Sequence, residues 1–399
     1  MINWMTLWFW IATVHLAAVL LLIWRLAINR SQLQRLSDHP VGTGDELPSI
    51  SIVVAARNEA RDIEAALNSW FELDYPNLEL VVVNDRSTDD TGEILDRLAQ
   101  QQPVLEVVHL EELPAGWLGK NHALQLGAQR SRGEYLLFTD ADIIIQPLVL
   151  RRAMAYSEQR QLDHLTMTPE VSMPSRLLEA FVTLFGTLFS LYFRVWKVSD
   201  PNSDAHVGIG AFNLVRSEAY RECGMHQPIA MRPDDDVKLG KIIKQHGFAQ
   251  ELVVGSDQIR VPWYASLKEL MVGLEKNALA GLDYRLSFVL MGSLLLLVGL
   301  FSPWVAVFLT TGVTRWLYGV ILLLLIIIFL TGASEIGVHY SSVFWYPVAV
   351  LLFNYILWRA TILTYVRGGI RWRDTFYPLA DLKANKVPWM QALILLLSV

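Results

Sequence analysis

The sequence predicts an α/β fold with a mostly parallel sheet, flanked by transmembrane helices towards both ends of the chain. Three observations support this prediction. Short β-rich apolar runs alternate with helical stretches in the first half of the chain, which is typical of a Rossmann-like mixed sheet. Apolar blocks of membrane-spanning length lie near both ends. Acidic clusters lie between these blocks, and the first two follow predicted strands.

Composition narrows the class of protein. The 399 residues suffice for one large globular domain plus membrane segments. Hydrophobic residues make up 53% and charged residues 18%, and the mean hydropathy is +0.33, which is too apolar for an ordinary soluble enzyme. The net charge of −6 gives no support for nucleic-acid binding. The single cysteine, Cys223, excludes an intrachain disulfide and fits a reducing compartment.

Residues 1–39 are predicted to form a membrane anchor and a basic linker. Trp4 to Trp24 is nearly continuous apolar sequence without a basic n-region or a cleavage site, so it is interpreted as an anchor and not as a signal peptide. Basic residues follow it directly: Arg25, Arg30 and Arg35. By the positive-inside rule, the next domain (45–285) faces the cytoplasm of a multi-pass protein in the cell (inner) membrane.

The central domain is predicted from alternating strands and helices. The expected strands are Ile50–Ala56, Leu78–Asp85, Leu105–Leu110 and Tyr135–Asp140, and the expected helices are Glu59–Phe71, Thr91–Gln101 and Lys120–Arg130. The apolar stretch at about 177–198 is interpreted as a helix lying in the membrane interface. A single crossing there would separate Asp142 from Asp236; a buried core helix is the alternative.

The region 286–366 is predicted to contain transmembrane or re-entrant helices. Its apolar blocks are Leu286–Leu309, Trp316–Thr331 and Val343–Tyr365. Three crossings would place Arg367, Arg371 and Arg373 outside, so the first block is expected to break at Ser302-Pro303 and to re-enter. The remainder, 367–399, is expected to be a basic cytoplasmic segment whose last stretch, Met390–Val399, rests on the interface.

The acidic residues after the strands suit a ligand site, because open α/β sheets bind ligands at the carboxyl ends of their strands. Asp85 ends one strand and can accept the imide N–H of a uracil ring; helix capping better explains Ser87, Thr88 and Asp89. Asp140 and Asp142 lie two residues apart, so both carboxylates can reach one site. Oxygen ligands of this kind suit Mg²⁺ or Mn²⁺.

Two further motifs carry charge at predicted helix starts. Lys120 opens a helix after a Pro-Ala-Gly turn, where an anion site and an ordinary solvated lysine are both reasonable interpretations. The run Asp234-Asp235-Asp236 opens another helix. Acidic first turns stabilise helices, but three adjacent carboxylates exceed that need. Their mutual repulsion raises a pKa towards the range that a general base requires.

These motifs together resemble a known family. Ser51 to Glu59 (SIVVAARNE), Val83 to Thr91 (VNDRSTDDT), Thr139 to Asp142 (TDAD) and Pro233 to Leu239 (PDDDVKL) resemble family 2 of the inverting glycosyltransferases, which have the GT-A fold. The flanking membrane segments resemble its lipid-glycosylating branch, the ceramide glucosyltransferase-like, hopanoid-associated and carotenoid-type enzymes. The resemblance covers roughly residues 45–285 by motif and the C-terminal helices by layout.

The resemblance implies a role for each motif. It places the donor nucleotide at Ala56, Arg57, Glu59 and Asp85, with Lys120 nearby. Asp142 would contact the metal, and Asp140 the metal or the sugar and ribose. Asp236 would be the general base, and Asp235 would replace the glutamate that precedes it. The segment Gly208 to Asn213 would face the acceptor, although a plain turn explains it almost as well.

One element departs from the family pattern. Related synthases carry a Gln/Arg-x-x-Arg-Trp element where this chain has Gln258, Arg260 and Trp263, and Pro262 occupies the arginine position. Proline cannot contact a leaving diphosphate, so Arg260 or Lys276 is the candidate substitute. Trp263 is expected beside the substrates. The departure weakens the prediction of a processive polysaccharide synthase.

The function expected from the sequence is transfer of a sugar from a nucleotide-sugar donor to a membrane lipid. The donor is expected to be UDP-linked. Because a hydroxyl acceptor needs a base and a phosphate does not, the acidic run favours a lipid hydroxyl. The alternatives are a processive polysaccharide synthase, a polyprenyl-phosphate glycosyltransferase, and a non-catalytic membrane scaffold. The sequence is silent on oligomeric state.

Overall fold

A computed structural model describes residues 4–30, 32–44 and 46–387 of the chain. The chain forms two compact units. The first comprises Met1–Gln32, Val171–Tyr192 and Trp263–Phe376, and the second comprises Leu33–Glu170, Phe193–Pro262 and Tyr377–Val399. The predicted interfacial segment Met390–Val399 lies outside the described residues.

The second unit is built around a mixed sheet. Its strands are β1 (Gln34–Arg35), β2 (Ile50–Ala56), β3 (Leu78–Asp85), β4 (Leu105–Leu110), β5 (Tyr135–Phe138), β6 (Ile144–Ile145), β7 (His164–Ser172), β8 (Asn213–Arg216) and β9 (Gln250–Pro262). The strand order is β1-β9-β7-β8-β5-β2-β3-β4, with β6 paired to β9. Both expectations, a mixed α/β sheet and long apolar helices on either side of it in sequence, are confirmed.

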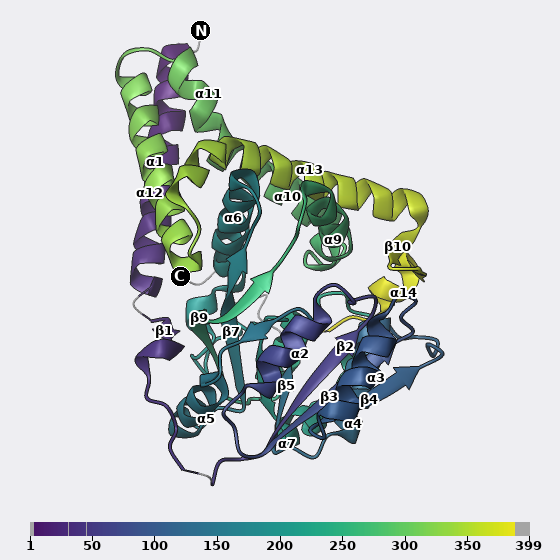
Figure 1. The fold of residues 1–399 in the computed structure, drawn as a ribbon. Helices are drawn as coiled ribbons and strands as arrows, with labels where there is room; N and C mark the ends of the chain where they lie inside the picture. The colour runs from purple at the N-terminus through teal and green to yellow at the C-terminus, as the bar shows by residue number, and fades with distance from the viewer. Residues whose placement is uncertain (1–3, 31, 45, 388–399) are drawn as a thin grey trace. The chain divides into compact units, whose positions relative to one another are not determined.

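Helices connect these strands (Figure 1). In the second unit they are α2 (Ile63–Phe71), α3 (Thr91–Gln101), α4 (Gly119–Arg130), α5 (Val149–Arg160), α7 (Ser217–Glu222), α8 (Asp235–Gln245) and α14 (Leu379–Ala384). Short 3₁₀ turns lie at Leu36–Asp38, Val195–Lys197 and Gln227–Ile229. The predicted boundaries of β2, β3, β4 and α3 match the structure, and α2 starts four residues later than predicted, at Ile63.

The sheet changes direction at β5. Strand β5 pairs in parallel with β2, with Ile50 opposite Tyr135, and antiparallel with β8, with Phe138 opposite Asn213. Strands β2, β3 and β4 are parallel neighbours. The carboxyl ends of β2, β3 and β5 therefore lie at one edge, and β8 begins beside the end of β5.

Helix α4 lies against β2 and β3 because a glycine permits close approach. A Cβ at Gly127 would lie 2.6 Å from Val53 and 3.2 Å from Val83. The faces in contact are apolar, since Val53, Val83, Leu124 and Ala128 are all buried. This packing fixes the start of α4, and with it Lys120, at the edge where the parallel strands end.

The first unit is helical. Its elements are α1 (Trp4–Arg30), α6 (Arg176–Phe193), α9 (Leu267–Ala280), α10 (Leu286–Leu294), a π-helical stretch (Leu295–Phe301), α11 (Ser302–Leu309), α12 (Gly312–Ile336), a 3₁₀ stretch (Tyr340–Trp345) and α13 (Tyr346–Arg367). The hairpin β10 (Gly369–Trp372) and β11 (Thr375–Pro378) follows α13 in the chain. Helices α1 and α12 run side by side (Figure 1).

Within the described part of the chain, five segments are long and apolar enough to cross a membrane: Trp4–Ala27, Arg176–Phe193, Leu286–Leu309, Gly312–Ile336 and Tyr340–Arg367. Their composition indicates membrane association. The π-helical stretch interrupts the third segment just before Ser302, near the predicted break at Ser302-Pro303. The re-entrant path, the interfacial placement of α6 and the domain boundaries stay predictions.

Cys223 lies in the core of the second unit and is 3% exposed. It packs in a cluster with Leu136, Tyr220 and Ile243. Burial raises the pKa of its thiol to about 12, so Cys223 is a core residue and an unreactive thiol.

Candidate active site

The predicted site residues gather where the parallel strands end. Ala56 ends β2, Asp85 ends β3, and Asp140 follows β5 by two residues. Strand β2 is paired with β3 through Ala56, which lies opposite Asn84, the residue before Asp85. The edge described by Ala56, Asp85 and Asp140 is where open α/β sheets bind ligands.

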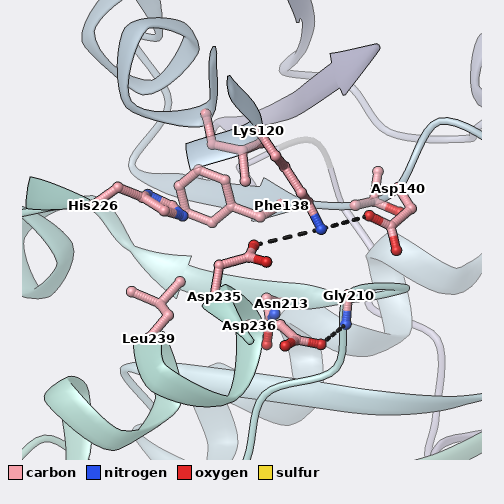
Figure 2. A pocket seen from close by; sticks show the side chains of 11 residues that line it. Lys120, Phe138, Asp140, Gly210, Asn213, His226, Asp235, Asp236 and Leu239 are labelled. Carbon is pink, nitrogen blue, oxygen red and sulfur yellow. Dashed lines mark hydrogen bonds and ion pairs between the residues drawn. The ribbon is translucent and has the colours of Figure 1, made fainter. Parts of the chain in front are cut away.

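Lys120 links the two acidic motifs. From the first turn of α4, its Nζ lies 2.8 Å from Asp140 Oδ1 and 3.4 Å from Asp235 Oδ2 (Figure 2). Burial acts to lower the pKa of Lys120, but the carboxylates of Asp140, Asp235 and Asp236 outweigh it and raise that pKa. Lys120 therefore stays charged and holds residues from two elements in one pocket.

Gly210 separates Asp140 from Asp236. Its N–H donates to Asp236 Oδ2 at 2.8 Å, while its carbonyl accepts from the N–H of Asp140 at 3.1 Å. A Cβ at Gly210 would lie 2.7 Å from Asp140 Oδ2 and 3.5 Å from Asp236 Oδ2. The peptide at this position therefore spaces the two carboxylates, and a Cβ here would displace the Asp140 carboxylate from its present position.

The environment of Asp236 favours its protonated form more than usual. Burial and the neighbouring Asp235 raise the pKa of Asp236 to about 7, against the lowering effect of Lys120. The N–H of Val237 also donates to Asp236 Oδ1 at 2.8 Å. A carboxylate with a pKa near neutrality can both accept and release a proton at neutral pH.

Asp142 is a carboxylate that lacks a cationic partner. Among the described residues, no lysine or arginine forms an ion pair with it. Burial, together with Asp140 and Glu59, raises its pKa to about 7. The carboxylate oxygens of Asp142 and of Asp140, two residues before it, are ligands that suit a hard divalent cation such as Mg²⁺ or Mn²⁺. No group of three or more His, Cys, Asp or Glu side chains in the described chain is arranged to hold a metal, so water or a ligand oxygen would have to complete the coordination.

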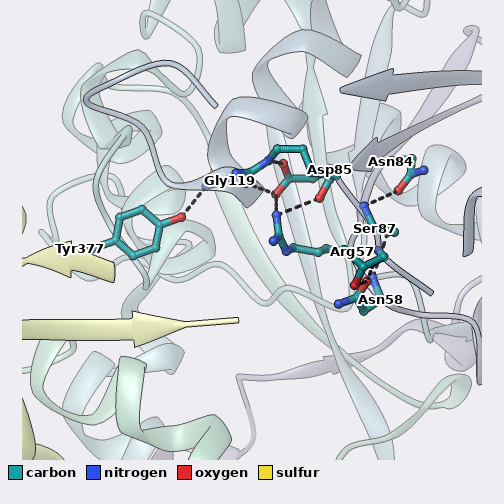
Figure 3. A network of polar contacts seen from close by, with 9 residues as sticks. Arg57, Asn58, Asn84, Asp85, Ser87, Gly119 and Tyr377 are labelled. Carbon is teal, nitrogen blue, oxygen red and sulfur yellow. Dashed lines mark hydrogen bonds and ion pairs between the residues drawn. The ribbon is translucent and has the colours of Figure 1, made fainter. Parts of the chain in front are cut away.

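Asp85 forms ion pairs with two arginines, Arg57 and Arg86, and Figure 3 shows it beside Arg57. Arg86 Nε lies 2.7 Å from Asp85 Oδ1 and its Nη2 lies 3.1 Å from Oδ2, which makes a bidentate pair. Arg57 Nη1 donates to the Asp85 carbonyl at 3.1 Å. Arg86 and Asn58 both have left-handed backbones, with φ of 56° and 55°, a conformation that non-glycine residues rarely adopt and that often marks functional sites.

The start of α4 touches Asp85. A Cβ at Gly119 would lie 2.2 Å from Asp85 Oδ2, so only glycine fits here. The N–H of Gly119 donates to Tyr377 Oη at 3.3 Å. Asp85, Gly119 and Lys120 thus form one continuous edge from the end of β3 to the pocket of Figure 2.

The loop before the acidic run is pinned by an asparagine. Asn121 Nδ2 donates to the carbonyls of Ile229, Ala230 and Arg232 at 2.8, 3.2 and 2.9 Å. Arg232 in turn forms a bidentate pair with Asp234, with both distances 2.8 Å. Asp234 therefore neutralises buried Arg232, which leaves Asp235 and Asp236 as the two acids of the run that line the pocket.

Several site residues were not predicted from the sequence. His226 lines the pocket, is buried, and has its pKa lowered to about 3 by burial and by Lys120, so it is neutral. Tyr377 was also missed. Gly119 and Asn121 were noted only as part of a predicted helix start, and Gly210 and Asn213 only as part of the segment Gly208 to Asn213. The sequence feature that could have pointed to the two glycines, Gly119 and Gly210, is their position close to the acidic motifs.

The predicted Gln-Arg-Trp element is divided between the two units. In β9, Gln258 Oε1 accepts a hydrogen bond from Arg152 at 3.2 Å. The Arg260 side chain is largely exposed and lies 3.4 Å from Glu170. Trp263 belongs to the first unit, where its ring lies 5.1 Å from Phe185 and 5.0 Å from Tyr264. Lys276, in the same unit, lies 3.7 Å from the Trp372 ring.

The comparisons with known proteins agree with a mixed α/β sheet that carries carboxylates where its parallel strands end. The model of the family described as Glycosyl transferase family 2 matches residues 51–224. The matched segment runs from β2 to β8 and includes Asp85, Lys120 and Asp140. The acidic run at Asp235 and Asp236 follows it directly in the chain.

Two curated relatives show what kinds of proteins this chain is similar to. The β-monoglucosyldiacylglycerol synthase of Synechocystis sp. is 37% identical over 123 residues, which are 29% of this chain and 25% of the relative. The poly-β-1,6-N-acetyl-D-glucosamine synthase of Staphylococcus epidermidis is 32% identical over 200 residues, 49% of this chain and 45% of that protein. The chain thus spans less than half the length of these relatives.

A solved structure supports the fold. The mannosyltransferase PcManGT of Pyrobaculum calidifontis, in complex with GDP-Man and Mn²⁺, superposes with a TM-score of 0.53 over 90% of this chain and 99% of its own. The sequence identity is 18%, so the likeness concerns the fold, which is of the GT-A type in both. That neighbour holds a nucleotide sugar and Mn²⁺.

Proposed function

We propose that this protein is an inverting glycosyltransferase that moves a sugar from a UDP-sugar to a hydroxyl group of a membrane lipid. The observation that carries the proposal is the single pocket in which Lys120 joins Asp140 to Asp235 and Gly210 joins Asp140 to Asp236. This pocket combines a metal-binding candidate, an anion-binding cation and a base with a pKa near neutrality.

The donor lies along the edge of the sheet in this proposal. Asp85, Arg57 and Ala56 hold the nucleoside end, and Lys120 contacts the diphosphate. Asp140 and Asp142 hold Mg²⁺ or Mn²⁺, which supplies positive charge against the charge that develops on the leaving diphosphate. Arg86 must release a carboxylate oxygen of Asp85 before the nucleobase of the donor can reach that oxygen. Donor binding therefore includes a movement of Arg86.

Asp236 is the proposed general base. Its Oδ2 accepts the hydroxyl proton of the acceptor while the hydroxyl oxygen attacks the anomeric carbon on the face opposite the diphosphate, which inverts the configuration. The Gly210 N–H orients this carboxylate. Asp235 keeps Lys120 in place from the other side, and it is a positioning residue in this scheme.

A lipid acceptor is proposed from two considerations. The long apolar segments favour membrane association, and a base with a raised pKa suits a hydroxyl better than an already ionised phosphate. The Synechocystis relative is named for a glycolipid product, which supports the same class. The staphylococcal relatives are named for a polysaccharide, so product length is the decisive measurement.

The test uses the full-length protein in detergent or nanodiscs with labelled UDP-sugars, Mn²⁺ and a panel of lipids. We expect one sugar on one lipid class, identified by mass spectrometry, and no product from Asp236→Asn, which still binds the donor. Lipid profiles of cells with and without the protein would name both substrates. A ladder of sugars would indicate a polysaccharide synthase, and near-normal transfer by Asp236→Asn would refute the base assignment.

A further inference from the structure

The last described part of the chain packs on the acidic pocket's surroundings. We call Tyr377–Val387, which includes α14, the C-terminal strap. It belongs to the second unit. Tyr377 is 6% exposed and Leu382 is fully buried, so the strap contributes to the core of that unit. It follows the membrane segments in sequence and is separated from the acidic run by about 150 residues.

Asn385 bonds the strap to the loop that precedes the acidic run. The N–H of Met231 donates to Asn385 Oδ1 at 2.8 Å. Asn385 Nδ2 donates to the carbonyl of Pro228 at 2.9 Å. One side-chain amide therefore uses both its acceptor and its donor on backbone groups, as a neighbouring strand would.

The same loop is held from its other side by α4. Asn121 Nδ2 donates hydrogen bonds to three carbonyls of the loop. The N–H of Leu118 donates to the carbonyl of Ala230 at 2.8 Å. The backbone from Pro228 to Arg232 is thus hydrogen-bonded by two asparagine side chains, Asn121 and Asn385. Four residues separate Met231 from Asp236, with Arg232 already fixed by its pair with Asp234.

The strap also reaches the helix that carries the two acids. Lys241 of α8 is 2% exposed, and its Nζ donates to the carbonyl of Val387 at 3.0 Å. At its other end, Tyr377 Oη accepts from the N–H of Gly119, one residue before Lys120. The strap therefore contacts the loop before Asp235, the helix after Asp236, and the start of the helix that bears Lys120.

We infer that Asn385 is a positioning residue for the reaction: through Met231 and Pro228 it fixes the loop that sets where Asp235 and Asp236 stand relative to Lys120. This inference rests on the proposed function of that pocket. Misplacing a catalytic group by about 1 Å costs on the order of 100-fold in rate. Ala56, Asp85 and Asp140 lie on or directly after β2, β3 and β5 and not on this loop, so we expect Asn385 to act on the acid pair and the rate more than on donor binding.

The test compares Asn385→Ala and Asn385→Asp with the wild type, using the full-length protein. For Asn385→Ala we expect kcat to fall about 10- to 100-fold, with the donor KM unchanged within about twofold. Hydrogen exchange of the amides from Met231 to Asp236 should accelerate, and exchange in β2 and β3 should stay the same. Asn385→Asp keeps the acceptor for the Met231 N–H and should recover part of kcat.

Asn77→Ala is the matched control, because Asn77 is an exposed asparagine whose Nδ2 makes one bond, to the Leu47 carbonyl at 3.0 Å. It should leave kcat, KM and exchange at Met231 unchanged. Wild-type kcat in Asn385→Ala with faster exchange at Met231 would overturn the inference, and so would a loss of protection across the whole sheet. A wild type that transfers no sugar would overturn the proposed function instead, while exchange at Met231 would still decide whether Asn385 holds the loop.

Discussion

The ammonium of Lys120 lies 2.8 Å from a carboxylate oxygen of Asp140. The two residues come from different elements, since Lys120 is in the first turn of α4 and Asp140 follows β5. The same ammonium lies 3.4 Å from Asp235. A single cation therefore offsets the mutual repulsion of carboxylates from both motifs, and several properties of the site depend on it.

Lys120→Met is expected to shift the pH dependence of transfer. The base Asp236 must be deprotonated, so kcat falls as pH falls through its pKa of about 7. Lys120 lowers that pKa, and its removal therefore raises the pKa and moves the acidic limb of the profile to higher pH. We also expect kcat at pH 8 to fall by about 100-fold. An acidic limb that stays in place in a pH–kcat profile would refute the coupling.

Gly210→Ala is expected to abolish most activity without unfolding the protein. The new Cβ would lie 2.7 Å from Asp140 Oδ2 and would force the two carboxylates apart. We predict a loss of roughly 100-fold or more in kcat, measured with thermal unfolding as a check. Gly186→Ala is the control, because nothing lies within 4 Å of its Cβ position. Equal activities of the two variants would contradict the assigned role of Gly210.

Gly119→Ala is expected to act on donor binding. Its Cβ would lie 2.2 Å from Asp85 Oδ2, so Asp85 must move away from the position at which it meets the nucleoside. The donor KM should rise about tenfold or more, which corresponds to the loss of one good hydrogen bond to a charged group, with a smaller effect on kcat. Titration of the purified variant with UDP measures this directly. Unchanged UDP affinity would remove Asp85 from the donor site.

Binding of Mn²⁺ is expected to depend on pH. Without a cation the pKa of Asp142 is raised to about 7, so below that pH a proton competes with the metal. The apparent affinity should therefore fall by up to about tenfold per pH unit as pH drops from 7 to 5. Calorimetric titration of the protein with Mn²⁺ at pH 8 and pH 6 measures the effect, and Asp142→Asn should bind weakly at both. Equal affinities at the two pH values would contradict a site at Asp142.

The first half of the sheet was predictable because its strands are short apolar runs that each end at a polar motif. β2, β3 and β4 have the predicted boundaries, and Lys120 and Asp140 lie at the expected edge. The second half was not predicted. β9 carries polar residues such as Gln258 and Arg260 through its 13-residue length, so it lacks the continuous apolar run that marks a buried strand.

Details of the site depended on backbone geometry that residue patterns do not express. The Asp85–Arg86 pair requires a left-handed arginine, with φ of 56°, which a residue pattern gives no reason to expect. Gly210 acts through its N–H and its missing side chain, so its sequence signal is only a glycine between two acidic motifs. Asn385 acts on a loop about 150 residues away in the chain, and local periodicity carries no information at that range.

Burial of the sole cysteine makes the protein convenient for spectroscopy. Because Cys223 lies in the core with a raised pKa, maleimide reagents will find no competing thiol in the native protein. A cysteine introduced at an exposed position such as Lys386 would then carry a fluorophore or a spin label alone. Distances from that label, followed during turnover, would report whether the C-terminal strap stays in place.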